Sequence, residues 1–101
     1  MNGGLSGFDW DEGNRAKCQK HGVSIAEIEA LFTRPLAIRP DPRHSLAEQR
    51  VVAVGKGKAG RMIFLAFTLR RRDGKTYIRP ISARYMHKHE VEAYEKENPN
   101  L

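Results

Sequence analysis

The segment RMIFLAFTL, residues 61–69, constrains the fold more than any other part of the chain. An extended strand sends successive side chains to opposite faces of its sheet, and this segment is apolar at both sets of positions. Such a strand is buried on both faces, as strands in the middle of a sheet are. We therefore expect residues 61–69 to form the central strand of a sheet.

Two neighbouring segments predict further strands of an antiparallel meander. QRVVAVG follows Glu48 and ends its strand at Val54, and TYIRPIS covers residues 76–82. The connecting segments GKGKAG and RRRDGK contain the glycines that hairpin turns require, and the Asp-Gly pair of the second is a hairpin signature. Residues 36–38 can add a short strand. Because the two hairpin links are short, the strands should follow one another in sequential order.

Two segments predict helices before the meander. The first covers about residues 11–20 and ends at Gly22, a residue type common just after helices. The second begins with a capping box, in which Ser24 and Glu27 would each accept a hydrogen bond from the other's backbone N–H. It stops before Pro35, because the residue preceding a proline disfavours helix.

A third helix is expected after the meander, from about Ala83 through Tyr94. The order of elements predicts an α+β fold with two N-terminal helices, an antiparallel three- to four-stranded meander sheet and a C-terminal helix. The length of 101 residues fits one domain. We expect residues 1–7 to be a flexible N-terminal tail and residues 8–98 to be the single domain.

The net charge of +6 and the pI of about 9.8 are high for a short chain. They favour attraction to RNA, to DNA or to an acidic protein, and composition alone does not choose among these. No apolar run approaches the length that spans a membrane, and the N-terminus does not resemble a signal peptide. The single cysteine, Cys18, cannot form an internal disulfide. These features favour the cytoplasm.

The stretch YIRPISARY, residues 77–85, places two arginines and a serine in an expected strand. By strand alternation Arg79 and Arg84 should face opposite ways, but Pro80 permits a β-bulge that would reset the alternation. Together with Arg50 they could then converge as a phosphate cradle, because guanidinium groups bind phosphate bidentately. The alternative is that they are exposed arginines of an edge strand, where charge prevents aggregation.

RNA cleavage is a reaction that such a domain can carry out without a cofactor. The 2′-hydroxyl of RNA attacks its own phosphate, so the protein supplies a base, an acid and cations for the developing charge. His21 or Glu48 could be the base, and His21 or a lysine the acid. The spacing of His87 and His89 makes a poor chelating pair, and Cys18 alone is not a zinc site, so we expect neither a metal nor another cofactor.

The chain resembles the BrnT family of bacterial toxins. The resemblance is carried by FDWDEGNRAKCQKHGVS, by EIEALF followed by Pro35, by EQRVVAVG, by RPISAR, and by Glu90 and Tyr94 near the C-terminus. Each motif alone is weak, but their order and spacing through nearly the whole chain are specific.

The resemblance implies a RelE-like fold and a metal-independent ribonuclease that cuts mRNA and inhibits translation. It also implies a cognate antitoxin, usually with a ribbon-helix-helix DNA-binding part, so that DNA would be contacted only indirectly. The positions that match the family are His21, Glu48, Arg50, Arg79, Ser82 and Arg84, and all of them except Ser82 are expected to be catalytic. Lys20, Ser82, Tyr85 and Tyr94 would contact RNA. The alternative function is a non-catalytic basic module that binds nucleic acid or protein, or a decayed toxin that keeps only antitoxin binding.

Overall fold

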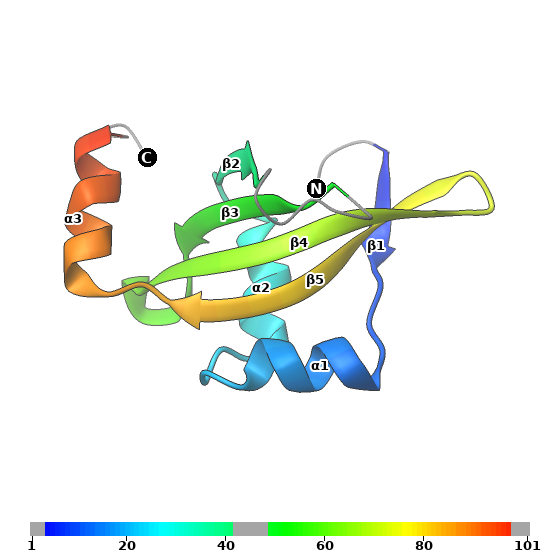
Figure 1. Cartoon of the computed structure of the whole chain (residues 1–101), viewed down its shortest axis with the longest axis horizontal. Coiled ribbons are helices and arrows are strands. Elements are labelled where there is room, and N and C mark those ends of the chain that lie inside the picture. Colours follow the sequence, from blue (N-terminus) through cyan, green and yellow to red (C-terminus); the bar gives the residue numbers. More distant parts are fainter. Residues whose placement is uncertain (1–3, 42–48, 98–101) are drawn as a thin grey trace.

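A five-stranded mixed sheet forms the centre of the chain in a computed structural model that describes residues 4–41 and 49–97 (Figure 1). The strand order is β1-β5-β4-β3-β2, with β1 parallel to β5 and the other neighbours antiparallel. The strands are β1 (Leu5–Phe8), β2 (Ala37–Pro40), β3 (Val51–Lys56), β4 (Met62–Arg72) and β5 (Lys75–Tyr85), and the helices are α1 (Glu12–Gln19), α2 (Ile25–Leu31) and α3 (Lys88–Glu97).

The meander of β2 to β5 confirms the sequential order that the short links predict. β4 lies in the middle of the sheet, as the apolar segment of residues 61–69 predicts. β4 and β5 are joined by Asp73 and Gly74, which have φ of 50° and 76°. Both values lie in the left-handed region that a two-residue type I′ hairpin turn requires.

β1 corrects the prediction of an antiparallel sheet that begins after the helices. It covers Leu5–Phe8, which overlaps the end of the segment 1–7 that we expected to be a tail, and it pairs in parallel with β5. The backbone N–H of Asp9 extends this pairing by donating to the carbonyl of Ile78 at 2.8 Å. LSGF is short and contains a glycine, so it does not predict a strand on its own. The strand forms because pairing with β5 supplies most of its stabilisation.

Both N-terminal helices begin at the expected side chains. The Asp11 carboxylate caps α1 and forms a reciprocal capping box with Asn14. Ser24 caps α2 by accepting the N–H of Glu27 at 3.1 Å. The second half of the predicted box is corrected, however, because the Glu27 carboxylate accepts hydrogen bonds from the Tyr85 hydroxyl and the N–H of Lys58.

The C-terminal helix starts later than the sequence predicts. We expected helix from about Ala83, but Ala83 pairs with Leu65 and Tyr85 pairs with Ile63, so β5 continues to Tyr85. α3 begins only at Lys88. The cause is tertiary, because the long central strand offers a partner to every residue of β5 except Ile81, and that pairing prevails over local helix propensity.

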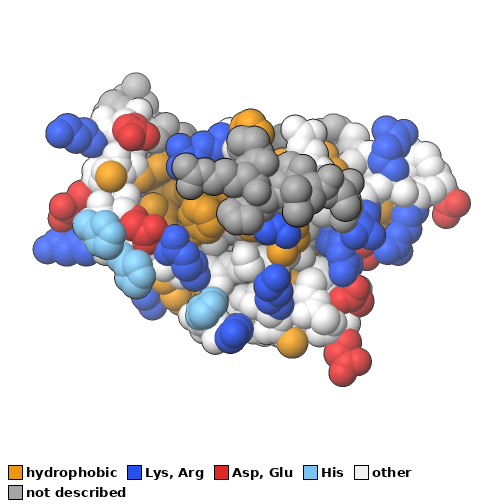
Figure 2. Space-filling model, in the orientation of Figure 1, with side chains coloured by type: hydrophobic (Ala, Val, Ile, Leu, Met, Phe, Trp, Pro, Cys, Tyr) orange, Lys and Arg blue, Asp and Glu red, His pale blue; other side chains and the backbone are white. Residues whose placement is uncertain are grey.

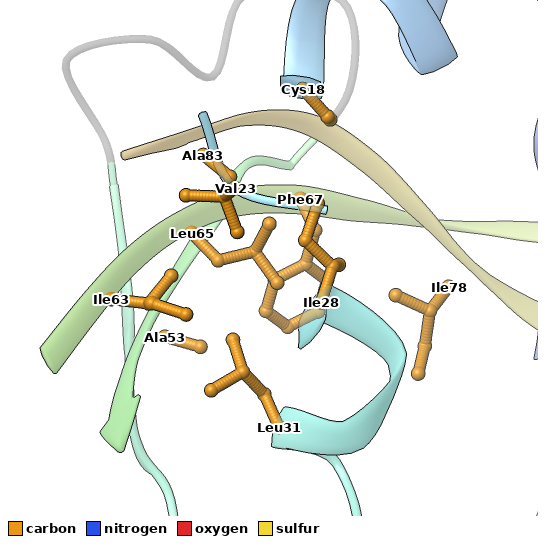
Figure 3. Close-up of a cluster of buried hydrophobic side chains, with 10 residues drawn as sticks. All are labelled: Cys18, Val23, Ile28, Leu31, Ala53, Ile63, Leu65, Phe67, Ile78 and Ala83. Carbon is orange, nitrogen blue, oxygen red and sulfur yellow. The ribbon is translucent and has the colours of Figure 1, made fainter. Parts of the chain in front are cut away.

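The helices α1 and α2 cover one face of the sheet, which we call the helix-pair face. Its core contains Ile63, Leu65 and Phe67 of β4 packed against Ile28 and Leu31 of α2 (Figure 3). The remaining members of this cluster are Cys18, Val23, Ala53, Ile78 and Ala83.

The other face carries the alternate side chains of the same strands, and we call it the arginine face for reasons given below. Val52, Val54 and Met62 form a second, smaller apolar cluster there. Val91 and Tyr94 of α3 pack against this cluster, although no residue of α3 is itself buried. α3 is therefore a peripheral helix that contacts only one end of this face (Figure 1).

The side chain of Asn14 connects α1 to β5 by hydrogen bonds inside the fold. Its buried side-chain amide donates to the carbonyls of Asp9 and Pro80, both at 2.9 Å. β1 pairs with β5 only as far as Ile78. Pro80 therefore lies where α1, rather than a strand, flanks β5, a position in which the missing proline N–H costs little.

We predict that Asn14→Ala lowers the free energy of unfolding by about 1–3 kcal/mol, because it removes the donor for two carbonyls inside the fold. Urea denaturation measures the change. Gln19→Ala is the matched control, since the Gln19 amide binds only the exposed carbonyl of Arg15 in the same helix. Equal stability of the two variants would show that Asn14 does not hold α1 on β5.

Candidate functional site

A β-bulge in β5 places Arg79, Ser82 and Arg84 on one face of the sheet. Arg84 pairs with Phe64, Ser82 with Ala66, and Arg79 with Thr68. The pairing register shifts between Ala66 and Phe67, and Ile81 is the extra residue on β5. Phe64, Ala66 and Thr68 alternate along β4 and so share a face. The extra residue therefore resets the alternation, and both arginines lie on the arginine face.

The arginines form a row rather than a single cradle. Thr68 is four positions after Phe64 on β4, which corresponds to about 13 Å along the strand. By the same alternation Arg50 is expected beside Thr68 on this face, because it precedes Val51, which pairs with the core residue Phe67. The row is long enough to contact more than one nucleotide, with Ser82 between its two ends.

Arg79 is held by two carboxylates. Its guanidinium contacts Asp9 at 3.4 Å and Asp11 at 2.7 Å. Asp9 is nearly buried, and it also binds Arg72 at 2.9 Å. A hydrogen bond from the Asn14 backbone N–H, together with one from Arg79, lowers the pKa of Asp11. Arg79 therefore links the β1–α1 connection to the row.

Arg84 forms a bidentate pair with Glu90 at the start of α3. Each terminal nitrogen donates to one carboxylate oxygen at 2.8 Å. Glu90 also accepts the N–H of His87, and the guanidinium lies 4.8 Å from the ring centre of Phe64. These bonds, that from Arg84 above all, lower the pKa of Glu90 to about 2. Glu90 is therefore ionised at neutral pH and competes with any phosphate for Arg84.

A groove lies beside this pair, between the arginine face and α3. It has a volume of about 510 Å³, and its lining includes Val54, Phe64, Met86, Glu90 and Tyr94. Figure 2 shows its apolar side chains exposed next to α3, with basic side chains close by. The groove thus combines an apolar floor with a charged rim.

The comparison with protein families identifies the chain. Residues 10–90 match the model of a family described as the ribonuclease toxin, BrnT, of type II toxin–antitoxin systems. The chain belongs to the BrnT family. Membership implies a ribonuclease toxin with a cognate antitoxin as partner, and it confirms the resemblance found in the motifs. No curated protein matches the chain.

The two tyrosines expected to contact RNA lie apart from each other in this BrnT-family chain. Tyr85 projects to the helix-pair face, where its hydroxyl donates to Glu27 at 2.6 Å and the Arg61 guanidinium lies 3.7 Å from its ring centre. The hydrogen bond to Glu27 raises the pKa of Tyr85. Tyr94 lines the groove on the arginine face.

The candidate acid–base residues are not brought to the row by any described contact. His21 and Lys20 lie in the exposed turn after α1, and no hydrogen bond or ion pair between described residues involves the His21 side chain. Glu48 lies outside the described residues. The roles expected for these three residues stay predictions from the sequence.

Cys18 is buried in the core of the helix-pair face. Burial raises its pKa to about 11, so the thiol is not poised as a nucleophile. Within residues 4–41 and 49–97 no group of three or more His, Cys, Asp or Glu could hold a metal ion. No helix in the same part of the chain is long and apolar enough to cross a membrane.

Sequence reasoning missed Asp9 and Asn14 as residues that position the row. Asp9 lies two residues before the expected helix start at about residue 11, in a position that indicates no such role. Its contact with Arg79 joins residues 70 positions apart, and no local pattern signals such a pair.

We predict that Arg84→Gln raises the pKa of Glu90 from about 2 toward its ordinary value of 4.5, because the largest cause of the lowered pKa is removed. Since the folded-state pKa is the lower one, the pair stabilises the fold above pH 4.5, and this contribution is lost as the pH falls toward 2. Carboxyl ¹³C NMR titration measures the midpoint.

Arg15→Gln is the matched control, since Arg15 is exposed on α1 and contacts the ring of Trp10. The Glu90 midpoint should stay at the wild-type value in this variant. An unchanged Glu90 midpoint in Arg84→Gln would mean that the pair is absent in solution.

Proposed function

We propose that the chain is a metal-independent endoribonuclease that cuts mRNA, and that Arg79 and Arg84 bind the RNA backbone at the site of cleavage. The observation that carries this proposal is the bulge at Ile81, which gives both arginines and Ser82 a common face. A ribonuclease that uses the 2′-hydroxyl as nucleophile needs cations beside the phosphate more than it needs a nucleophile of its own.

The carboxylate partners of the arginines support this role by holding the guanidinium groups in place. A guanidinium that binds both oxygens of a carboxylate has the planar geometry that also suits two phosphate oxygens. The side chain of Arg84 is 36% exposed and that of Arg79 is 21% exposed, so both are accessible from solvent. An incoming phosphate would displace Glu90 from Arg84 without moving β5.

The general base is proposed to be His21 or Glu48, and the sequence does not choose between the two. The described carboxylates of the row are unsuited to that role, because an effective base has a pKa near the working pH. The pKa of Glu90 is about 2, and that of Asp11 is also lowered. The base must therefore come from outside the ion pairs.

The same proposal covers the partner and the wider fold. The antitoxin would neutralise the protein by direct binding, and a ribbon-helix-helix part of it would contact DNA. The described arrangement, with two helices on one face of the meander and one helix after it, supports a RelE-like fold. Inhibition of translation in the cytoplasm would follow from loss of mRNA.

A second candidate function is a binding module without catalysis, including a decayed toxin that keeps only antitoxin binding. One observation favours it: both arginines of the row are already paired with carboxylates. In that case the ion pairs would serve the fold, and RNA would stay intact in the presence of the protein.

We predict that Arg79→Lys and Arg84→Lys each slow RNA cleavage by about 100-fold, because lysine keeps the charge but loses the paired donors. Cleavage of a labelled RNA by purified protein, with a chelator present throughout, measures the rate. The chelator should leave the wild-type rate unchanged.

Arg15→Lys is the matched control, since Arg15 is exposed on α1 and contacts the ring of Trp10. It should cut at the wild-type rate. Wild-type cleavage rates for both Arg79→Lys and Arg84→Lys would contradict the assignment of these arginines to the cleavage site. RNA that stays intact with the wild-type protein would favour the binding module.

A further inference from the structure

The hairpin formed by β4 and β5 extends beyond its neighbouring strands (Figure 1). Pairing with β3 ends at Phe67, and β1 pairs with β5 only at Thr76 and Ile78. Beyond Phe67, β4 therefore pairs with β5 alone, and the hairpin is two-stranded only at its tip beyond Thr76. The apolar side chain of Leu69 is 47% exposed. The segment RRRDGK at the end of the hairpin is predicted from the sequence only as a turn.

Strand alternation divides the side chains of this ribbon between the two faces. Arg79 pairs with Thr68, and toward the tip the next same-face pairs are Arg70 with Tyr77 and Arg72 with Lys75. Arg71 pairs with Thr76 and belongs to the opposite face. The arginine face therefore continues along the hairpin as a basic stripe, defined here as Arg70, Arg72, Lys75 and Tyr77.

The stripe has an excess of positive charge. The stripe contains three basic side chains, Arg70, Arg72 and Lys75, and the one acidic residue among residues 70–75 is Asp73. Asp9 adds a carboxylate that binds Arg72, but it is nearly buried and shared with Arg79. Figure 2 shows lysine and arginine side chains gathered at the hairpin end of the molecule. This distribution complements a polyanion that runs along the strand direction.

We infer that the basic stripe is a second RNA-binding surface, which holds the single strand that leads to or from the cleavage row. Arg84 and Lys75 pair with Phe64 and Arg72, which are eight positions apart on β4, so the row and the stripe together extend about 26 Å. Such a surface would contact several nucleotides. The inference rests on the proposed function for its substrate, and it adds where the RNA lies outside the cleavage site.

Tyr77 gives the stripe a contact that suits a single strand. It lies between basic residues on the same face and is partly exposed. A tyrosine ring can stack on any unpaired base, whereas the bases of a duplex are already stacked on one another. The combination of cations with an interleaved aromatic ring therefore favours single-stranded RNA over duplex DNA.

Binding to a 2′-O-methyl RNA tests the inference separately from cleavage, because this RNA lacks the nucleophile that the proposed reaction requires. Fluorescence anisotropy gives the affinity of the full chain over a range of salt concentrations. Each phosphate contact contributes about 0.7 to the slope of log K against log salt for a single strand. Arg70→Gln and Lys75→Gln should each reduce the magnitude of the slope by about this amount.

Arg71→Gln is the matched control, since it removes the same charge from the same hairpin but from the opposite face. It should leave the slope unchanged. An equal loss in Arg71→Gln, or no loss in the two stripe variants, would overturn the inference. Failure of the wild-type chain to bind the RNA would do the same.

Tyr77→Leu should weaken binding by at least about fivefold without changing the salt slope, because stacking is not an ionic contact. A wild-type affinity for this variant would overturn the stacking contact. Duplex DNA of the same sequence is the competing ligand. Stronger dependence on Arg70 and Lys75 for DNA than for RNA would overturn the choice of RNA.

Cleavage of ordinary RNA by the wild-type chain is measured in parallel. Stripe variants that lose slope while the wild type fails to cut RNA would support the surface and contradict the proposed function. Stripe variants that bind as the wild type does, in a protein that cuts RNA, would contradict the surface alone.

Discussion

The bulge at Ile81 is the constraint on which the two faces of the sheet depend. Ile78 and Pro80 precede it, Ala83 and Tyr85 follow it, and all four lie on the helix-pair face. Their spacing of two, three and two residues fits one face of a strand only if one extra residue is inserted. The same insertion brings Arg79 and Arg84 together on the other face. Core packing and the arginine row therefore share one cause.

The carboxylates around the row have two effects that oppose each other. Asp9, Asp11 and Glu90 keep the guanidinium groups ordered, which reduces the entropy that RNA binding would cost. They also lower the positive potential at the row, because each phosphate must compete with an existing partner. Glu90 is the weakest point of this arrangement, since it is carried by α3, a helix without buried residues.

Much of the fold follows from local sequence patterns, because those elements are specified locally. The central strand, the Asp73–Gly74 turn and the Ser24 cap each depend on a few adjacent residues. The predictions fail where contacts with distant segments determine the secondary structure. β1 forms only by pairing with β5, and β5 continues to Tyr85 because β4 pairs with it there. Glu27 leaves its expected capping bond for Tyr85, which is 58 residues away.

In the candidate site, too, some features follow from local sequence and others depend on distant contacts. Pro80 indicated that a bulge could bring the arginines to one face, because proline in a strand accompanies irregular pairing. The carboxylates that hold Arg79 and Arg84 were not assigned to that role, since ion pairs between distant segments leave no periodic signal. Tyr85 lies on the helix-pair face because the alternation of side chains restarts after the bulge. No motif in the sequence shows where that alternation restarts.

The most direct test of this account follows the side-chain Nε–Hε NMR signals of the arginines while 2′-O-methyl RNA is added. The account predicts shifts for Arg70, Arg79 and Arg84 on the arginine face. It predicts none for Arg15 and Arg34, which lie in α1 and just after α2. Shifts confined to Arg15 and Arg34 would place RNA on the helix-pair side and contradict the account.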